Sequence, residues 1–346
     1  MRILLIKMSS MGDVFHTFPA LSDALQNTPG LVVDWVVESA FAEIPKWHPA
    51  VDKVYAIELR KWRKQPFKYR AQIKAFFAHV NQTHYDLVID AQGLLKSAWV
   101  AKKMHAKTAG YDWSSAREPL ATWFYHYKYP VSKQQHAIVR LRQLLAQCLG
   151  YSLATNAPMV YGLTNQAWSK PSLVTEQFAD NDYWVFLHGT TWTTKYWPED
   201  YWIELLQKAN AIGKKVILPW GNADEHQRAI RISRHVEAEN VWVPQAMLSL
   251  NDMAKTLKNA QAVVSVDTGL SHVAAALEVP MVVLYRVTDP KLVGADGQNV
   301  VHLCSPLATK YLKKFTQPCQ ENDSLQGLLV EDVIKALSNK LALSTV

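Results

Sequence analysis

The sequence predicts an α/β protein built from two parallel β-sheets, each with its own crossover helices. Short runs of β-branched and apolar residues alternate with segments of helical periodicity, which is typical of parallel sheets. A chain of 346 residues is longer than a single hydrophobic core normally supports. A stretch of turn residues from about Asn156 to Pro171 divides the alternation into two halves. We therefore predict two domains, residues 1–160 and 161–325, followed by a terminal helix in residues 326–346.

The first half contains predicted strands and a helix that follows the first of them. The strands are Arg2–Lys7, Val32–Val37, Val54–Ile57 and Leu87–Asp90. The apolar face of the helix consists of Val14, Phe18, Leu21 and Leu25. Pro19 is compatible with a helix only in its first turn, so we expect the helix to begin near Thr17. Gly12 and Asp13 would then lie in the loop after the first strand.

The second half repeats the alternation and ends in an amphipathic segment. Its predicted strands are Tyr183–Leu187, Lys215–Leu218, Val241–Val243, Ala262–Val266 and Met281–Tyr285. Helices are predicted at Glu199–Ala211, near Asp224–His235 and from Gly269 onward. The apolar periodicity of Leu329–Leu343 predicts a terminal helix that packs back across the first domain.

Composition and charge exclude several classes of protein. Apolar residues make up 49% of the chain and charged residues 19%, as in an ordered globular protein. The apolar run Ile3–Ile6 is too short for a signal peptide or membrane span, and three widely spaced cysteines indicate neither a disulfide framework nor a zinc site. Residues 1–165 hold 20 Lys and Arg against 11 Asp and Glu, whereas residues 166–346 hold 17 against 19. The basic first half suits an anionic macromolecule or membrane surface, and the near-neutral second half suits a smaller ligand.

Asp13 is the first candidate catalytic residue. It follows the first predicted strand, and side chains just past the carboxyl ends of parallel strands line the ligand crevice in open α/β folds. Because Asp also favours the N-terminus of a helix, a purely structural capping role is the alternative. The helix start expected near Thr17 weakens the capping interpretation and favours a site residue.

A strand-turn-helix segment in the second half is a candidate phosphate site. The strand Ala262–Val266 runs into Asp267-Thr268-Gly269-Leu270-Ser271-His272 and then into a helix. Gly269 lets a phosphate approach the backbone, while the first helical turn presents free N–H groups and the positive end of the helix dipole. An ordinary turn capped by Asp267 or Thr268 is the alternative. No GxGxxG or GxxxxGK[ST] motif supports nicotinamide or P-loop binding.

Polar residues after two other strands extend this candidate site. The strand Tyr183–Leu187 leads to Thr190, Thr191 and Lys195, whose neutral donors and single charge suit a departing diphosphate. Glu225 lies beyond the strand that ends at Leu218 and could accept two hydrogen bonds from a ribose diol, with a first-turn carboxylate as the alternative.

No metal site is expected. The segment Asp180-Asn181-Asp182 matches the DxD pattern by which many glycosyltransferases hold a metal, but it precedes a strand, so we interpret it as a polar turn. The 12 histidines show neither HxH nor HExxH spacing.

A basic segment in the first half predicts an anion-binding surface. Arg60-Lys61-Trp62-Arg63-Lys64 places four cations within five residues and is flanked by Trp47 and Phe67. A solvated charged face is the alternative, but interleaved aromatic residues suit a phosphorylated, partly apolar partner at a membrane face. Further positive or proton-carrying groups in this half are Arg117, His136, Arg140 and Arg142.

In these motifs the chain resembles the lipopolysaccharide heptosyltransferases, the ADP-heptose glycosyltransferase family with the GT-B fold. The segments that carry the resemblance are Lys7-Met8-Ser9-Ser10-Met11-Gly12-Asp13-Val14-Phe15-His16-Thr17, Asp34-Trp35-Val36-Val37-Glu38, Arg60–Lys64, Ile89-Asp90-Ala91-Gln92-Gly93-Leu94, Ala116-Arg117-Glu118-Pro119-Leu120, Lys133-Gln134-Gln135-His136-Ala137, Lys195-Tyr196-Trp197-Pro198-Glu199 and Ser265-Val266-Asp267-Thr268-Gly269-Leu270-Ser271-His272. The chain departs from the family at Trp192-Thr193-Thr194, where we expect acidic residues in relatives.

The resemblance implies two Rossmann-like domains facing a cleft, with the acceptor in the first and the donor in the second. It implies inverting transfer of L-glycero-D-manno-heptose from ADP-heptose to the inner Kdo of Kdo2-lipid A. The implied donor-binding residues are Ser9, Ser10, Thr190, Thr191, Lys195, Glu225, Met247 or Leu248 near the adenine, Asp267, Thr268, Gly269, Leu270 and His272. The implied acceptor-binding residues are Ser10, Arg60, Lys61, Arg63, Lys64, Arg117, His136 and Arg140.

On this hypothesis Asp13 is the general base and Lys195 helps to stabilise the leaving ADP, with no metal and no cofactor. We expect a monomer in the cytoplasm of a Gram-negative bacterium, held peripherally and electrostatically at the inner face of the inner membrane. The alternatives are a heptosyltransferase that acts on a later core acceptor and another GT-B sugar-nucleotide enzyme, such as an epimerase. The pI of about 9.1 also suits a nucleic-acid-binding protein. We expect no nucleic-acid partner, because the chain has no RRM, KH or helix-turn-helix signature.

Overall fold

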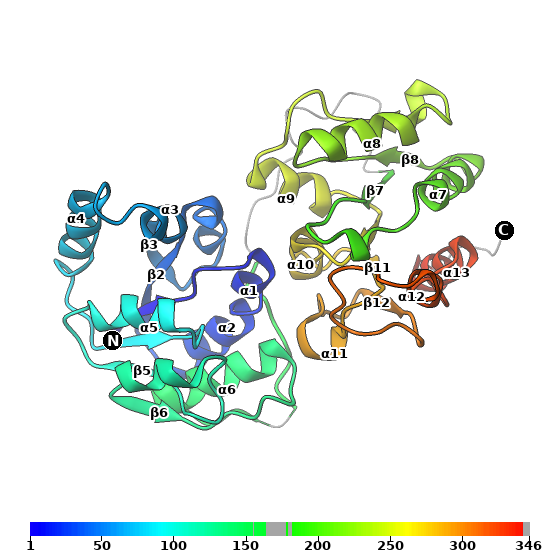
Figure 1. The fold of residues 1–346 in the computed structure, drawn as a ribbon. Coiled ribbons are helices and arrows are strands. Elements are labelled where there is room, and N and C mark those ends of the chain that lie inside the picture. The colour runs from blue at the N-terminus through cyan, green and yellow to red at the C-terminus, as the bar shows by residue number, and fades with distance from the viewer. Residues whose placement is uncertain (155, 164–177, 179–181, 342–346) are drawn as a thin grey trace. The chain divides into compact units, whose positions relative to one another are not determined.

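The chain folds into two compact units, Met1–Gln166 and Ala167–Val346. The computed structural model describes residues 1–154, 156–163, 178 and 182–341. Figure 1 shows the first unit in blue to green and the second in green to red. We predicted the boundary at residue 160. The division falls after Gln166 instead, within the linker predicted from about Asn156 to Pro171.

The strands described in the first unit form a parallel six-stranded sheet in the order β3-β2-β1-β4-β5-β6. They are β1 (Arg2–Ile6), β2 (Val32–Glu38), β3 (Val51–Ile57), β4 (Leu87–Asp90), β5 (Thr108–Tyr111) and β6 (Tyr127–Tyr129). The central strands β1 and β4 are buried on both faces, which is why they read as continuous apolar runs rather than alternating ones.

The first unit's helices connect these parallel strands. They are α1 (Met11–Phe15), α2 (Phe18–Asn27), α3 (Leu59–Lys64), α4 (Arg70–Val80), α5 (Leu95–Lys102) and α6 (Ala137–Leu149), with 3-10 turns η1 (Ser39–Phe41), η2 (Pro45–Trp47) and η3 (Pro119–Phe124). Trp62, Phe77 and Val100 of α3, α4 and α5 share one core cluster with Leu4 and Ile6 of β1. These helices therefore cover one face of the sheet.

The second unit repeats this architecture. Its described strands form a parallel sheet in the order β12-β11-β10-β7-β8-β9. They are β7 (Tyr183–Leu187), β8 (Lys215–Ile217), β9 (Val241–Trp242), β10 (Ala262–Val266), β11 (Met281–Tyr285) and β12 (Val300–Cys304). The helices are α7 (Glu199–Ala211), α8 (Ala223–Ser233), α9 (Leu250–Lys258), α10 (Gly269–Ala276), α11 (Pro290–Val293), α12 (Pro318–Asp323) and α13 (Val330–Leu341), with 3-10 turns η5 (Thr193–Lys195) and η6 (Ala238–Asn240).

Numbered within its own unit, each sheet has the strand order 3-2-1-4-5-6 of a dinucleotide-binding Rossmann fold. The direction in which the chain winds reverses between β1 and β4 in the first unit and between β7 and β10 in the second. Ligands of open α/β sheets bind beyond the carboxyl ends of the strands at such a switch point. The fold thus places one candidate binding region in each unit.

The terminal helix α13 contributes to the core of the second unit. Its buried residues Val330, Val333 and Leu337 pack with Trp202 of α7 and Val264 of β10. The apolar face of α13 is therefore buried against its own unit, and packing against the first domain stays a prediction. Periodicity identifies the face of a helix that is buried, but not the surface that buries it.

Candidate functional site

Asp13 lies at the switch point of the first sheet, in a helix rather than in a loop. It is the third residue of α1, which corrects the expectation of a loop, and Thr17 instead precedes the second helix, α2. The backbone N–H and the hydroxyl of Ser10 donate to Asp13 Oδ2 at 2.8 and 3.0 Å. Pro19 does stand in the first turn of α2, but one additional helical turn precedes it. Asp13 thus has a capping role and is also aimed at a pocket.

The second carboxylate oxygen of Asp13 is paired with a buried lysine. Lys7 Nζ lies 3.3 Å from Asp13 Oδ1 and also donates to the carbonyl oxygen of Ala91, at 3.3 Å. Burial raises the pKa of Asp13, but the charges of Lys7 and His16 and the hydrogen bonds from Ser10 outweigh it, so the pKa lies well below its usual value. Asp13 is therefore an ionised carboxylate at neutral pH, able to accept a proton.

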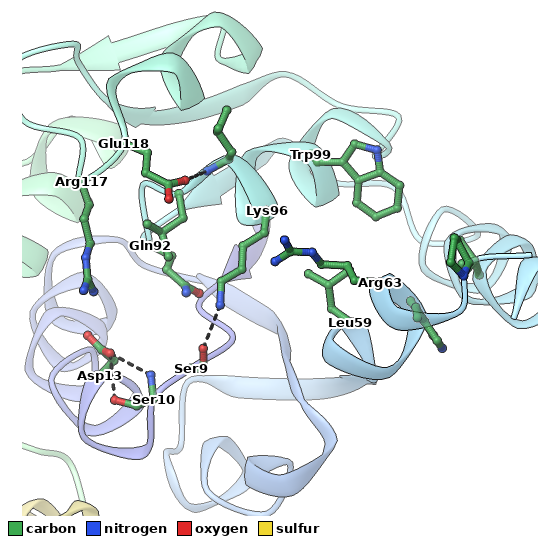
Figure 2. Close-up of a pocket in the computed structure, with 15 residues that line it drawn as sticks. Ser9, Ser10, Asp13, Leu59, Arg63, Gln92, Lys96, Trp99, Arg117 and Glu118 are labelled. Carbon is green, nitrogen blue, oxygen red and sulfur yellow. Dashed lines mark hydrogen bonds between the residues drawn. The ribbon is translucent and has the colours of Figure 1, made fainter. Parts of the chain in front are cut away.

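A pocket of about 930 Å³ opens beside Asp13 (Figure 2). It is lined by Ser9, Ser10, Asp13, Leu59, Trp62, Arg63, Pro66, Ile73, Gln92, Leu94, Leu95, Lys96, Trp99, Arg117 and Glu118. Figure 2 shows Arg63, Lys96 and Arg117 directed into the space that Asp13 borders. The pocket therefore combines one carboxylate with several cations and apolar walls.

Sequence reasoning missed Lys96 and Gln92 as site residues. Lys96 Nζ donates to Ser9 Oγ at 3.3 Å, and burial, together with the charges of Arg60 and Arg63, lowers the pKa of Lys96. The Gln92 side chain accepts from the Met8 N–H at 2.8 Å, which joins the ends of β1 and β4. Both residues follow β4, so the rule that directed attention to Asp13 could have found them had it been applied to that strand.

The predicted acceptor residues of the basic segment do not all lie together. Arg63 lines the pocket, whereas Arg60, Lys61 and Lys64 line a smaller hollow of about 360 Å³. After burial, the charge of Arg60 is a further cause that lowers the pKa of Lys96. Lys61 is ion-paired with Glu58 at 3.1 Å.

The aromatic residues that flank the basic segment differ in exposure. Trp47 is buried, whereas Phe67 is 94% exposed. Only Phe67 is therefore available at the surface.

Among the other predicted acceptor residues, Arg117 lines the pocket while His136 and Arg140 are engaged elsewhere. The His136 ring accepts from the Ile138 N–H at 3.2 Å and caps α6. Arg140 donates to the carbonyl oxygen of Ser115 at 2.7 Å and lies over the ring of Tyr111. These contacts hold both side chains within the first unit, and their role in acceptor binding stays a prediction.

In the second unit, the predicted phosphate residues converge at the switch point between β7 and β10. Lys195 Nζ lies 2.6 Å from Asp267 Oδ2, and Thr190 Oγ1 donates to the carbonyl oxygen of Asp267 at 2.9 Å. Thr268 occupies the N-cap position of α10, and Gly269 begins the helix. The Thr268 side chain makes no capping hydrogen bond and Asp267 is paired with Lys195, so neither side chain caps the turn. Donor groups of the first turn therefore stay available to an anion.

The remaining predicted donor residues differ in their exposure. Thr191 is exposed, Leu270 is half-buried and His272 is buried in α10. Met247 is 60% exposed and Leu248 is half-buried, both in the loop before α9.

Glu225 is a first-turn carboxylate, and its side chain also lies beside the loop that follows β7. Its Oε2 accepts from the Gly221 N–H at 2.8 Å in the first turn of α8, which is the structural role. The same carboxylate lies against the backbone of Gly189, where an added Cβ would stand 2.3 Å from Glu225 Cδ. Glu225 is thus held at the ends of both β7 and β8.

No cluster of three or more metal-ligating side chains occurs among the described residues. Asp180 and Asn181 of the DxD pattern lie outside those residues, and Asp182 is paired with Lys214 at 2.6 Å. In the same described part of the chain, no helix has the length and apolar character needed to cross a membrane.

Two Rossmann-type units with polar switch points define a protein of the GT-B class. The model of glycosyltransferase family 9 (heptosyltransferase) matches residues 73–324, and the chain belongs to this family. It is 48% identical to lipopolysaccharide heptosyltransferase 1 of Pseudomonas aeruginosa, over 95% of this chain and 91% of that protein.

Two solved structures of a related enzyme share the GT-B fold. The E. coli heptosyltransferase WaaC with ADP is 40% identical, with a TM-score of 0.85 over 98% of this chain and 100% of that one. The same enzyme with ADP-2-deoxy-2-fluoro heptose is 40% identical, with a TM-score of 0.83 over 98% and 99% of the two chains. The GT-B fold that the sequence predicted is confirmed.

Proposed function

We propose that this protein transfers L-glycero-D-manno-heptose from ADP-heptose to the inner Kdo sugar of Kdo2-lipid A, with inversion at the anomeric carbon. One observation carries the proposal: an ionised carboxylate, Asp13, borders a large pocket into which Arg63, Lys96 and Arg117 project. Kdo2-lipid A carries carboxylates and phosphates, which such cations bind. The similarity to heptosyltransferase 1 supports this acceptor over one later in the core.

In the proposed reaction the acceptor hydroxyl oxygen forms a bond to the anomeric carbon while the bond from that carbon to the diphosphate oxygen breaks. The hydroxyl proton moves to Asp13, and the electron pair of the broken bond leaves with ADP. Positioned bases of this kind contribute about 10² to 10⁴ in rate. Because the low pKa of Asp13 makes it a weak base, proton transfer occurs late, once the attacking hydroxyl has become acidic.

The second unit stabilises the leaving group in this proposal. Lys195, Thr190 and Thr191 offer a charge and hydroxyl donors, and α10 presents its N-terminal N–H groups beside them. Because the diphosphate departs without a proton, one carboxylate suffices, in contrast to the two carboxylates of most glycosidases. No metal or cofactor takes part in this mechanism.

We also infer that the protein is a monomer that works peripherally at the cytoplasmic face of the inner membrane, where its lipid acceptor lies. The side chains of Phe67 and Trp123 are 94% and 72% exposed. Phe67 follows the pocket-lining residue Pro66, and Trp123 lies in η3, which follows the pocket-lining residue Glu118. Exposed aromatic residues close to cations suit the interface of an anionic bilayer.

The test is to incubate the protein with ADP-heptose and Kdo2-lipid A and to weigh the acceptor. We expect the acceptor mass to increase by one heptose with the wild type and with Asp52→Asn, a matched exposed carboxylate. Asp13→Ala should abolish the increase but retain ADP binding. An unshifted acceptor with the wild type, or addition only to an acceptor that already carries heptose, contradicts the proposal.

A further inference from the structure

Two lysines from distant parts of the second unit approach the same aromatic ring. Lys195 Nζ lies 4.7 Å from the ring centroid of Trp192, and Lys313 Nζ lies 5.3 Å from it. Both distances are within the range of a cation–π contact. Trp192 is the first residue of the segment in which this chain departs from the pattern expected of its relatives.

The segment that carries Lys313 is tied to the site from both sides. Thr194 Oγ1 donates to the carbonyl oxygen of Leu312 at 2.7 Å, and the Tyr311 N–H donates to the carbonyl oxygen of Val287 at 2.5 Å. Phe315 lies over the buried guanidinium of Arg286, 5.1 Å from ring centroid to Cζ. These contacts hold the backbone of Lys313 beside the loop of Lys195.

Tyr311 shows that this arrangement is imposed on the segment. Its φ of 61° lies in the left-handed region, which non-glycine residues rarely adopt. Backbone strain of this kind persists only where the surrounding contacts over-determine it, and it concentrates at ligand clamps. Burial is the largest cause that raises the pKa of Tyr311, and the charges of Asp289 and Asp267 add to it.

Lys313 brings a second positive charge to the ring beside Lys195. Lys195 is already paired with Asp267 at 2.6 Å, which offsets most of its charge. Within the described residues, Lys313 has no carboxylate within ion-pair distance. Two ammonium groups that approach one ring both attract an anion bound beside it.

We propose that Lys313, Trp192 and Lys195 form an anion subsite that binds the terminal phosphate of the donor's diphosphate. The proposal rests on the proposed function, because it assigns the donor to the second unit. Trp192 acts as a platform that positions the two lysines, and Lys313 supplies the charge that Lys195 shares with Asp267. This would also explain why the chain can have Trp192-Thr193-Thr194 where acidic residues were expected.

The test compares Lys313→Gln with Lys314→Gln, an exposed lysine that neighbours it but has no described contact with Trp192. Binding of ADP and of AMP is measured by calorimetry at low and high salt. We expect Lys313→Gln to weaken ADP binding about five- to tenfold at low salt and AMP binding less than twofold, because AMP lacks the terminal phosphate. Lys313→Arg should restore ADP binding, and Lys314→Gln should leave both affinities unchanged.

Two results overturn the subsite: equal losses for ADP and AMP, or equal effects of Lys313→Gln and Lys314→Gln. Circular dichroism of each variant establishes that it is folded before binding is compared. If the wild type does not bind ADP at all, the proposed donor fails instead. If the wild type binds ADP and transfers heptose but Lys313→Gln has no effect, only the subsite is wrong.

Discussion

Replacing Lys7 by Gln tests whether the buried lysine keeps Asp13 ionised. Lys7 Nζ and Asp13 Oδ1 are 3.3 Å apart, which corresponds to about 5 kcal/mol at an effective dielectric constant of about 20. The Asp13 side chain is 32% exposed, so solvent reduces this value, and an opposite charge at this distance usually lowers a carboxyl pKa by about one to three units. We therefore expect Lys7→Gln to raise the pKa of Asp13 by about that amount.

The assay is the pH dependence of kcat/KM between about pH 4 and 8. Asp13 can accept a proton only when it is deprotonated, so activity falls as the pH drops through its pKa. In the wild type this pKa lies well below the usual value, and the acidic limb due to Asp13 should fall outside the range. In Lys7→Gln burial is opposed only by His16 and the hydrogen bonds from Ser10, so the limb should move to higher pH, toward the acidic end of the range.

Lys7→Arg is the control, because it keeps the charge and should retain the wild-type profile even if kcat decreases. Stability must be followed as well, since a carboxyl group whose folded pKa is lowered stabilises the fold above its unfolded pKa of about 4. That contribution is lost as the pH falls through the folded pKa. A Lys7→Gln profile that parallels the wild type at every pH would refute the reasoning.

Further predictions concern the donor, the metal and the membrane. Lys195→Met should lower kcat by about 10² or more and weaken ADP binding, because it removes a preorganised charge; a loss below threefold in steady-state kinetics contradicts this role. A chelator should leave turnover within about twofold, and a loss that Mg²⁺ restores would show that a metal takes part. Phe67→Ser with Trp123→Ser should weaken sedimentation with anionic phospholipid vesicles about tenfold or more, since each side chain buries apolar area at the interface. Leu307→Ser, which changes an exposed apolar residue of the second unit, should not weaken vesicle binding. An equal loss with Leu307→Ser would contradict a specific membrane-binding role of Phe67 and Trp123.

The strands and the family motifs could be predicted because they depend on neighbouring residues. The predicted strands agree with β1, β2, β4, β7, β8, β9, β10 and β11 to within one residue. Periodicity and buried apolar runs determine these elements locally. The extra helical turn of Asp13 was missed, because it depends on hydrogen bonds from Ser10 that no periodic pattern reveals in a helix of five residues.

Residue chemistry does not show which contacts a charged side chain makes within the fold. Arg140 is a candidate for binding an anionic acceptor, and its guanidinium also donates to the Ser115 carbonyl and packs over Tyr111. Lys96, which lines the pocket, carried no motif of its own. A charge in the sequence identifies a group able to bind an anion, but burial and hydrogen bonds decide whether that group is available.

The sequence by itself determined that this chain is an α/β protein of the heptosyltransferase family, with Asp13 and Lys195 each following a buried strand. Only the tertiary structure decided what surrounds them, because strand order brings distant segments to the same edge of a sheet. Lys7 beside Asp13, Lys96 across from Ser9, and Lys313 with Lys195 around Trp192 are contacts of this kind. Local patterns encode elements, whereas electrostatic environments arise only when the elements pack.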